Sequence, residues 1–194
     1  MKRKLSVITL VSATTFFFAA CGSSKKASET ATKEAVGDKE IIIPCAEFHS
    51  DKTTFRASQS SNSTNLSQSR DEAYIVAKQR LASLIESELK AVIQRYASER
   101  EINNKSEFND KFETMSRDVV KQTLRDTRIV CEKTMQKSDG SYNTFIAVEC
   151  DKESVYNGVN KGLANDEKLR QDYDVMKFKE VFDQEMEKLE NDKK

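Results

Sequence analysis

Residues 69–100 constrain the fold more than any other stretch, because their apolar side chains repeat at helical spacing over about nine turns. Ser69, with Glu72 three residues later, predicts a capping box at the start of this helix. We expect one long helix whose apolar side needs a sheet or further helices to cover it. The apolar side comprises Ala73, Ala77, Leu81, Leu84, Ile85, Leu89, Val92, Ile93 and Tyr96, and the opposite side carries Lys78, Gln79, Glu86, Lys90 and Gln94.

The first twenty residues have the pattern of a signal peptide. Basic residues at 2–4 precede an uncharged run at 5–20, which is shorter than the roughly 20 apolar residues that span a membrane. The sequence Phe-Ala-Ala-Cys at 18–21 resembles a bacterial lipobox, with phenylalanine where leucine is more common. The resemblance implies diacylation of the Cys21 sulfur, cleavage before Cys21 and acylation of the new amine. The alternative is ordinary secretory cleavage at Ala20.

The mature chain has a mildly acidic balance. Cleavage leaves about 170 residues, the size of one domain with extensions. It removes three of the 32 basic residues, so that 29 basic residues remain against 32 acidic ones. This balance argues against nucleic acid as a partner, because nucleic-acid binding depends on a clustered basic surface. We expect the lipid on Cys21 to hold the protein at the cell envelope, at the outer membrane facing the periplasm.

The N-terminal part of the mature chain changes character at residue 40. Residues 21–39 lack an apolar period, which predicts a flexible leash. The isoleucines 41–43 form a β-branched run that predicts a buried strand ending near Pro44. Alternating residues at 53–58 predict a second strand, which we expect to pair with the first as a hairpin. The polar residues 59–67 predict a loop.

The middle of the chain predicts a second helix and a second hairpin. Strands at 127–135 and 142–150 flank the turn signal Asp139-Gly140, and the later strand, apolar on both faces, is expected to be central. A helix over 106–125 is expected to cover the same sheet. Its apolar side comprises Phe108, Phe112, Met115, Val119, Val120 and Leu124.

The C-terminal part predicts a short helical turn ending near Gly158 or Gly162, followed by a helix over 165–189. We place a domain boundary after residue 162, between an α+β module at 40–162 and a charged amphipathic extension at 163–194. We expect the last helix to dock on the body or on a partner, so that Phe182→Asp releases it and leaves the module folded. The fold class is therefore α+β: a small, mainly antiparallel sheet packed against two amphipathic helices, with a C-terminal helical extension. The apolar stripe of the last helix comprises Leu169, Tyr173, Met176, Phe178, Val181, Phe182, Met186 and Leu189.

The order of these elements over residues 40–159 resembles the Lpp-twenty family of small bacterial lipoproteins and the related N-terminal module of flagellar assembly protein T. The resemblance implies a compact periplasmic α+β module that acts as an envelope-associated or assembly component, usually without known catalysis. It carries over no functional residue, because it rests on small and apolar core positions. The residues that carry the resemblance are Ala73, Ala77, Leu81, Ala82 and Leu84 in the helix, then 126–130, Asp139, Gly140, Tyr142 and Phe145 around the second hairpin.

Three cysteines remain beyond the anchor. In the oxidising periplasm we expect two of these cysteines to form a disulfide. Cys131 and Cys150 lie nearly opposite each other on the hairpin arms, so they can pair, or face different sides of the sheet if the register slips; Cys45 is the competing partner. The alternative is three buried thiols. Together with His49 these cysteines have the composition of a Cys₃His zinc site, but no Cys-x-x-Cys pair is present. We therefore predict no metal and no cofactor.

Catalytic motifs are scarce in this sequence. His49 is the single histidine, the serines lie outside any Gly-x-Ser-x-Gly motif, and five scattered glycines form no phosphate-binding loop. The sequence therefore predicts a non-enzymatic module that binds an envelope protein. Two alternatives stay open: a cell-wall or saccharide hydrolase that uses a carboxylate pair, and a carrier of an apolar ligand.

Overall fold

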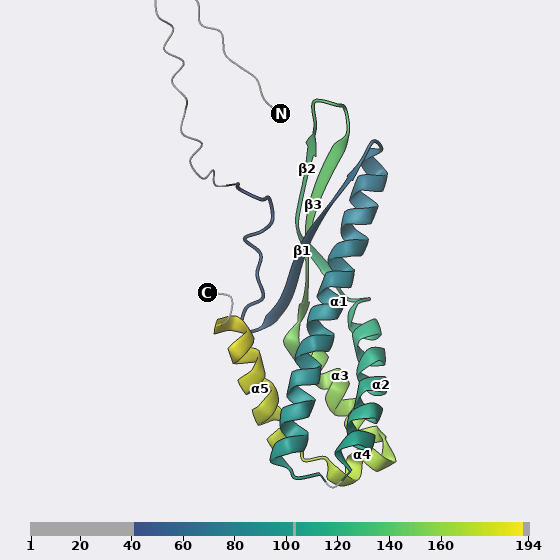
Figure 1. Ribbon diagram of the computed structural model, residues 1–194, viewed down its shortest axis with the longest axis vertical. Helices are drawn as coiled ribbons and strands as arrows, with labels where there is room; N and C mark the ends of the chain where they lie inside the picture. Colours follow the sequence, from purple (N-terminus) through teal and green to yellow (C-terminus); the bar gives the residue numbers. More distant parts are fainter. Residues whose placement is uncertain (1–40, 103, 192–194) are drawn as a thin grey trace, which may run out of the picture. The chain divides into compact units, whose positions relative to one another are not determined.

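The computed structural model describes residues 41–102 and 104–191, which belong to one compact unit (Figure 1). An antiparallel three-stranded sheet packs against helices, and a further helix follows at the C-terminal end, which confirms the predicted α+β class. The predicted signal peptide, the leash and Cys21 lie outside the described residues. The elements are β1 (Thr54–Ser63), α1 (Leu66–Glu99), α2 (Lys105–Thr123), β2 (Arg128–Gln136), β3 (Tyr142–Asp151), α3 (Lys152–Asn165), α4 (Glu167–Asp172) and α5 (Val175–Asn191).

The sheet has the strand order β1-β3-β2, so β3 is central as predicted. Ile146, Ala147 and Val148 are consecutive and buried, because both faces of this strand are covered. Gly140 turns the β2–β3 hairpin with a φ of 83°, in the left-handed region that suits glycine. The predicted second hairpin is therefore confirmed.

The predicted first hairpin is wrong. β1 runs to Ser63, through the first five residues of the predicted polar loop, and it pairs with β3. Isoleucines 41–43 form no strand with it. The polar residues 59–63 can continue the strand because β1 is an edge strand, where small polar side chains remain partly in contact with solvent.

Helix α1 begins three residues earlier than expected. The side chain of Asn65 caps it by accepting a hydrogen bond from the backbone of Gln68, so the predicted capping box is wrong. Ser69 is fully buried, and its hydroxyl donates to the carbonyl of Ser61 at 2.9 Å and lies 2.9 Å from the hydroxyl of Thr144. A residue predicted to cap the helix instead joins α1 to the sheet.

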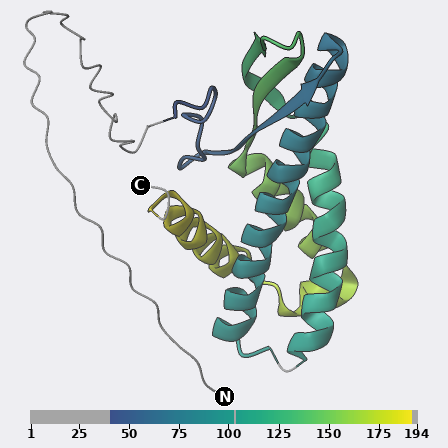
Figure 2. The same cartoon turned by 45° about the horizontal axis from the view of Figure 1, so that its top comes forward.

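The apolar side of α1 is buried as predicted, apart from a partly exposed Leu84. Its 34 residues give a length of about 51 Å, whereas the strands of 10 residues span about 33 Å. The helix therefore extends beyond the sheet. Its N-terminal half lies on β1 and β3, and its C-terminal half packs against other helices (Figures 1 and 2).

Helix α2 occupies the predicted range but packs against α1 and α3, so its expected position over the sheet is wrong. Helix α3 continues to Asn165, so the predicted end at Gly158 or Gly162 is also wrong. A Cβ added at Gly158 would lie 2.8 Å from a methyl group of Val119, and one at Gly162 would lie 2.4 Å from the sulfur of Met115. The glycines allow α3 to approach α2 closely.

The predicted final helix is two helices with a break at Tyr173 and Asp174. Tyr96 of α1 bridges this break: its hydroxyl donates to the carbonyl of Asp172 at 2.9 Å and accepts from the backbone N–H of Asp174 at 2.7 Å. Asp174 also accepts a hydrogen bond from the backbone of Lys177 in the first turn of α5. Backbone groups at the break lose their helical hydrogen-bond partners, and the hydroxyl of Tyr96, 76 residues before Asp172 in the chain, replaces some of them.

Helix α5 docks on the body through an aromatic cluster. Phe178 lies 5.5 Å from Tyr96, and Phe182 lies 5.4 Å from Tyr156, measured between ring centroids. These rings belong to the same hydrophobic core as the sheet and α1. The boundary predicted after residue 162 falls inside α3, and the residues up to 191 lie in the same compact unit.

Candidate functional site

An exposed run of isoleucines is the most unusual surface of the described chain. Residues 41, 42 and 43 are 78%, 89% and 55% exposed. Contiguous exposed apolar side chains mark interaction sites, because solvation of such a patch is costly without a partner. The backbone then turns, with the N–H of Ala46 donating to the carbonyl of Ile43 at 3.3 Å. This isoleucine run is the candidate binding surface.

A disulfide fixes the segment that follows the isoleucine run. Cys45 is bonded to Cys131 of β2, with 5.7 Å between their Cα atoms, and Cys150 is a buried free thiol. The Cys131–Cys150 pairing is therefore wrong, and the competing partner Cys45 takes the bond. Cys131 is paired with Ala147, three residues before Cys150, so the alternation of side chains places the two cysteines on opposite faces of the sheet.

The segment 45–51 lies across the face of the sheet that is turned away from α1. Besides the disulfide, Glu47 lies within 3.9 Å of Lys133 on β2. At β1, the hydroxyl of Ser50 accepts from the backbone N–H of Arg56 at 2.9 Å and donates to its carbonyl at 3.2 Å. The segment is thereby attached to both edge strands, and the isoleucine run begins where this attachment ends.

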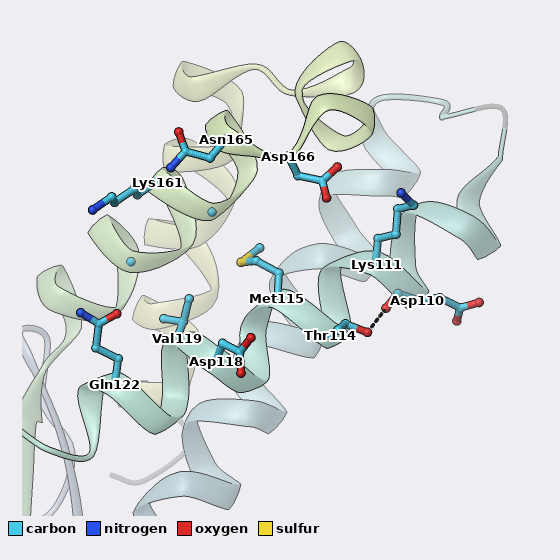
Figure 3. Close-up of a pocket in the computed structure, with 12 residues that line it drawn as sticks. Asp110, Lys111, Thr114, Met115, Asp118, Val119, Gln122, Lys161, Asn165 and Asp166 are labelled. Carbon is cyan, nitrogen blue, oxygen red and sulfur yellow. Dashed lines mark hydrogen bonds between the residues drawn. The ribbon is translucent and has the colours of Figure 1, made fainter.

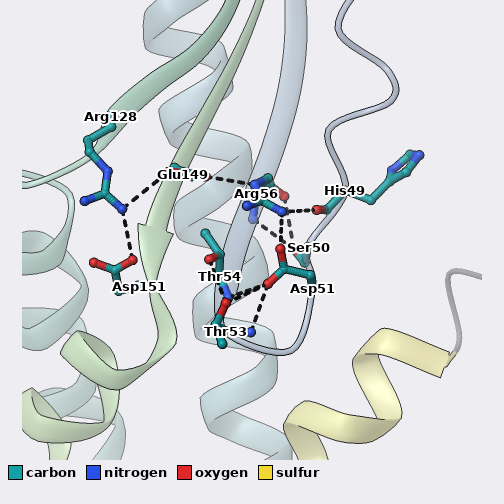
Figure 4. Close-up of polar contacts among 9 residues, drawn as sticks. All are labelled: His49, Ser50, Asp51, Thr53, Thr54, Arg56, Arg128, Glu149 and Asp151. Atoms are coloured by element: carbon teal, nitrogen blue, oxygen red, sulfur yellow. Dashed lines mark hydrogen bonds and ion pairs between the residues drawn. The ribbon is translucent and has the colours of Figure 1, made fainter.

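Ion pairs join this segment to the end of the sheet (Figure 4). The guanidinium of Arg56 contacts the carboxylates of Asp51 and Glu149, and Arg128 contacts Glu149 and Asp151 at 3.3 and 2.9 Å. Partial burial opposes the ionisation of Asp51, but hydrogen bonds from Thr53 and Arg56 outweigh it and lower the pKa of Asp51 to about 2. Each charge has an opposite partner, so the network holds the loop rather than presenting a reactive group.

His49 does not take part in this network through its side chain. Its carbonyl accepts a hydrogen bond from Arg56 at 3.0 Å, while its imidazole is exposed and points away from the carboxylates (Figure 4). Cys45 is consumed by the disulfide, and no group of three or more metal-binding side chains occurs among the residues that the structure describes. The structure therefore does not bring together the four residues of the zinc composition.

A groove of about 720 Å³ lies between α2 and α3 (Figure 3). Met115 and Val119 form its apolar floor below the two glycines of α3, and polar side chains line its rim. The charged lining residues are Asp110, Lys111, Asp118, Lys161 and Asp166. The mixture of signs around a wide opening favours no particular ligand.

The carboxyl groups give the hydrolase alternative no specific support. A general acid needs a raised pKa. At Asp51 and Glu185 burial acts to raise the pKa, but hydrogen bonds outweigh it and the pKa is lowered. At other described carboxyl groups, such as Glu72, hydrogen bonds also lower the pKa. Burial raises the pKa of the Cys150 thiol to about 12, which disfavours a nucleophilic thiolate. The other carboxyl groups with a lowered pKa are Glu72, Glu99, Glu107, Asp139 and Asp166.

None of the described helices is both long enough and apolar enough to cross a membrane. Comparison with known proteins gives no family: no protein-family model, no curated protein and no solved structure matches this chain. The resemblance to small envelope lipoproteins therefore stays a prediction.

Two features of the candidate site were missed from the sequence. The isoleucine run has strand-like composition, which predicted a buried strand, but the run is exposed. Its separation from β1 follows from the bond of Cys45 to Cys131 on β2, which the sequence does not show. The ion pair of Arg56 with Glu149 joins residues 93 positions apart and left no sequence signal. The three cysteines that remain beyond Cys21 were the one available clue, because an odd number leaves two pairings in competition.

Proposed function

We propose that this chain is a lipid-anchored, non-enzymatic binding or assembly module of the bacterial envelope, held at the outer membrane and facing the periplasm. The observation that carries the proposal is the exposed isoleucine run at 41–43, at the point where the predicted leash from Cys21 joins the body. The attachment of the adjoining segment also supports it, because it limits the positions that the isoleucine run can take and so reduces the entropy lost on binding.

The leash length is compatible with this arrangement. If residues 22–40 form the predicted flexible leash, these 19 residues have an average span of about 25 Å, so a lipid on Cys21 would keep the isoleucine run close to the membrane surface. A partner in the same membrane then meets this surface at a raised effective concentration. The proposed partner is therefore an envelope protein with an accessible apolar site.

Site-specific crosslinking in intact cells tests the partner. A photo-reactive amino acid at position 42 is expected to capture an envelope protein, whereas the same group at Met176 is the control, since Met176 is 84% exposed on α5. Mass spectrometry identifies the adducts. Equal capture from both positions, or capture from neither, contradicts binding at the isoleucine run.

Mass spectrometry of the mature N-terminus tests the anchor. We expect a triacylated Cys21 and release from the membrane, or retention as an unprocessed precursor, for Cys21→Ser. An unacylated mature chain starting at residue 21 contradicts lipidation, and so does a processed Cys21→Ser protein that stays in the membrane fraction.

A further inference from the structure

Strand β1 carries an open edge. Its odd-numbered residues turn their backbone groups toward β3, as the bond from the N–H of Lys152 to the carbonyl of Thr53 shows just before the strand. The even-numbered residues turn theirs outward. Those of Thr54 and Arg56 are bonded to Asp51 and Ser50 of the adjoining loop.

Beyond Arg56 no hydrogen bond joins the loop to this edge among the described residues, although Phe48 and His49 still lie beside Ser58 and Gln59. Within the described residues no hydrogen bond reaches the outward N–H and C=O groups of Ser58, Ser60 and Asn62. Residues 58–63 are uncharged and contain no proline, and β1 has no bulge in its pairing with β3. Residues 58–63 therefore lack three devices by which proteins usually prevent strand addition: charged side chains in the strand, proline and a bulge.

The opposite edge of the sheet does have such devices. Strand β2 contains an irregularity between Ile129 and Cys131, and it carries Arg128 and Lys133. A bulge twists an edge strand away from an incoming strand, and charged side chains disfavour pairing. The two edges thus differ, and β1 is the one suited to accept a strand.

The isoleucine run is a strand-forming segment without a strand partner. Three β-branched residues have high strand propensity, and here their side chains are 55–89% exposed. The run cannot pair with β1 of its own chain, because the next residues are held at β2. Cys45 is bonded to Cys131 on β2, and β3 lies between β2 and β1. The disulfide therefore keeps this segment away from its own open edge.

We propose that the isoleucine run of one copy adds as a strand to the β1 edge, at residues 58–62, of a second copy. A hollow of about 280 Å³ lies beside residues 56–59 of β1, between loop residues 48–50 and the α1 residues Arg80 and Leu84. It leaves room for a side chain of the added strand at Ser58. Neither segment carries a charge, so pairing brings no like charges together. The inference rests on the proposed function in one respect, because both use the isoleucine run as the binding surface. It names a second copy of this chain as an occupant of that surface and does not require the envelope partner.

Sedimentation equilibrium tests self-association on the full mature chain with Cys21→Ser, so that no lipid or detergent contributes. As its concentration rises from about 1 µM to about 1 mM, this protein, without further substitutions, is expected to shift from monomer to dimer or larger species. Ile42→Asp and Ser60→Pro are each expected to weaken association at least about tenfold, because one charges the donor strand and the other removes an outward N–H. Met176→Asp is the exposure-matched control and should associate like the wild type.

Mixing the two defective variants separates donor from acceptor. Ile42→Asp retains an intact edge and Ser60→Pro retains an intact donor, so the mixture should associate more strongly than either variant alone. If Ser60→Pro fails to fold, as its thermal melt will show, Ser60→Lys replaces it and keeps the backbone ladder. A monomeric wild type, association unaffected by Ile42→Asp, or no recovery on mixing overturns the inference. Crosslinks to a different envelope protein are read independently, so either proposal can fail without the other.

Discussion

The hydroxyl of Tyr96 tests whether α1 holds the break between α4 and α5. The ring of Tyr96 is fully buried and packs against Phe108 and Phe178, with centroid distances of 6.2 and 5.5 Å. Its hydroxyl makes hydrogen bonds with backbone groups of Asp172 and Asp174. Tyr96→Phe keeps the ring and its packing, so the substitution removes these two bonds and a weaker interaction of the hydroxyl with Arg100.

The expected cost follows from those two bonds. A hydrogen bond contributes about 1 kcal/mol net, and each partly buried backbone group left without a partner adds a desolvation penalty, which together give about 2–3 kcal/mol. For a chain of this size, each kcal/mol lowers the midpoint of thermal unfolding by about 2–4 °C. Tyr96→Phe should therefore lower the melting temperature by about 4–12 °C.

Thermal and urea unfolding measure the loss, and hydrogen exchange locates it. Tyr156→Phe is the matched control, because that ring lies in the same aromatic cluster and its hydroxyl makes no hydrogen bond with the residues described. Exchange should increase first at residues 174–178, where α5 begins. If Tyr96→Phe and Tyr156→Phe have equal melting temperatures, the hydroxyl does not stabilise the break and the reasoning fails.

Four further outcomes can be checked by unfolding measurements. Phe182→Asp should cost at least about 3 kcal/mol and unfold the sheet together with α5 in one transition, because the core is continuous; separate transitions would restore the boundary that the sequence suggested. Because folding lowers the pKa of Asp51 from 3.8 to about 2, its contribution is complete above pH 4 and is lost as the pH falls through about 2; Asp51→Asn should flatten the acid limb of the stability curve in that window. Gly158→Ala should destabilise more than Gly162→Ala, since the methyl groups of Val119 are held on a stiff side chain whereas Met115 can move; the reverse order would show that the closer contact at Gly162, and not side-chain stiffness, sets the cost. Cys131→Ser should cost about 2–4 kcal/mol, and an unchanged melting temperature would show that the disulfide adds no stability.

Local patterns determined most of the secondary structure. The apolar period of α1 and α2 and the Asp139-Gly140 turn act through neighbouring residues, so the sequence located both helices and the second hairpin. The central place of β3 also followed, because a strand that is apolar on both faces needs cover on both sides.

Long-range contacts decided the rest. The break after α4 depends on the hydroxyl of Tyr96, and the continuation of α3 through its glycines depends on α2 lying against them. The choice of Cys131 as the partner of Cys45 depends on which face of the sheet each cysteine occupies, which a bulge in β2 and the register with β3 set together. Composition shows that the isoleucine run prefers a strand, but only the tertiary structure shows that its own chain offers it none, because the covalent link of Cys45 to β2 draws it away from β1.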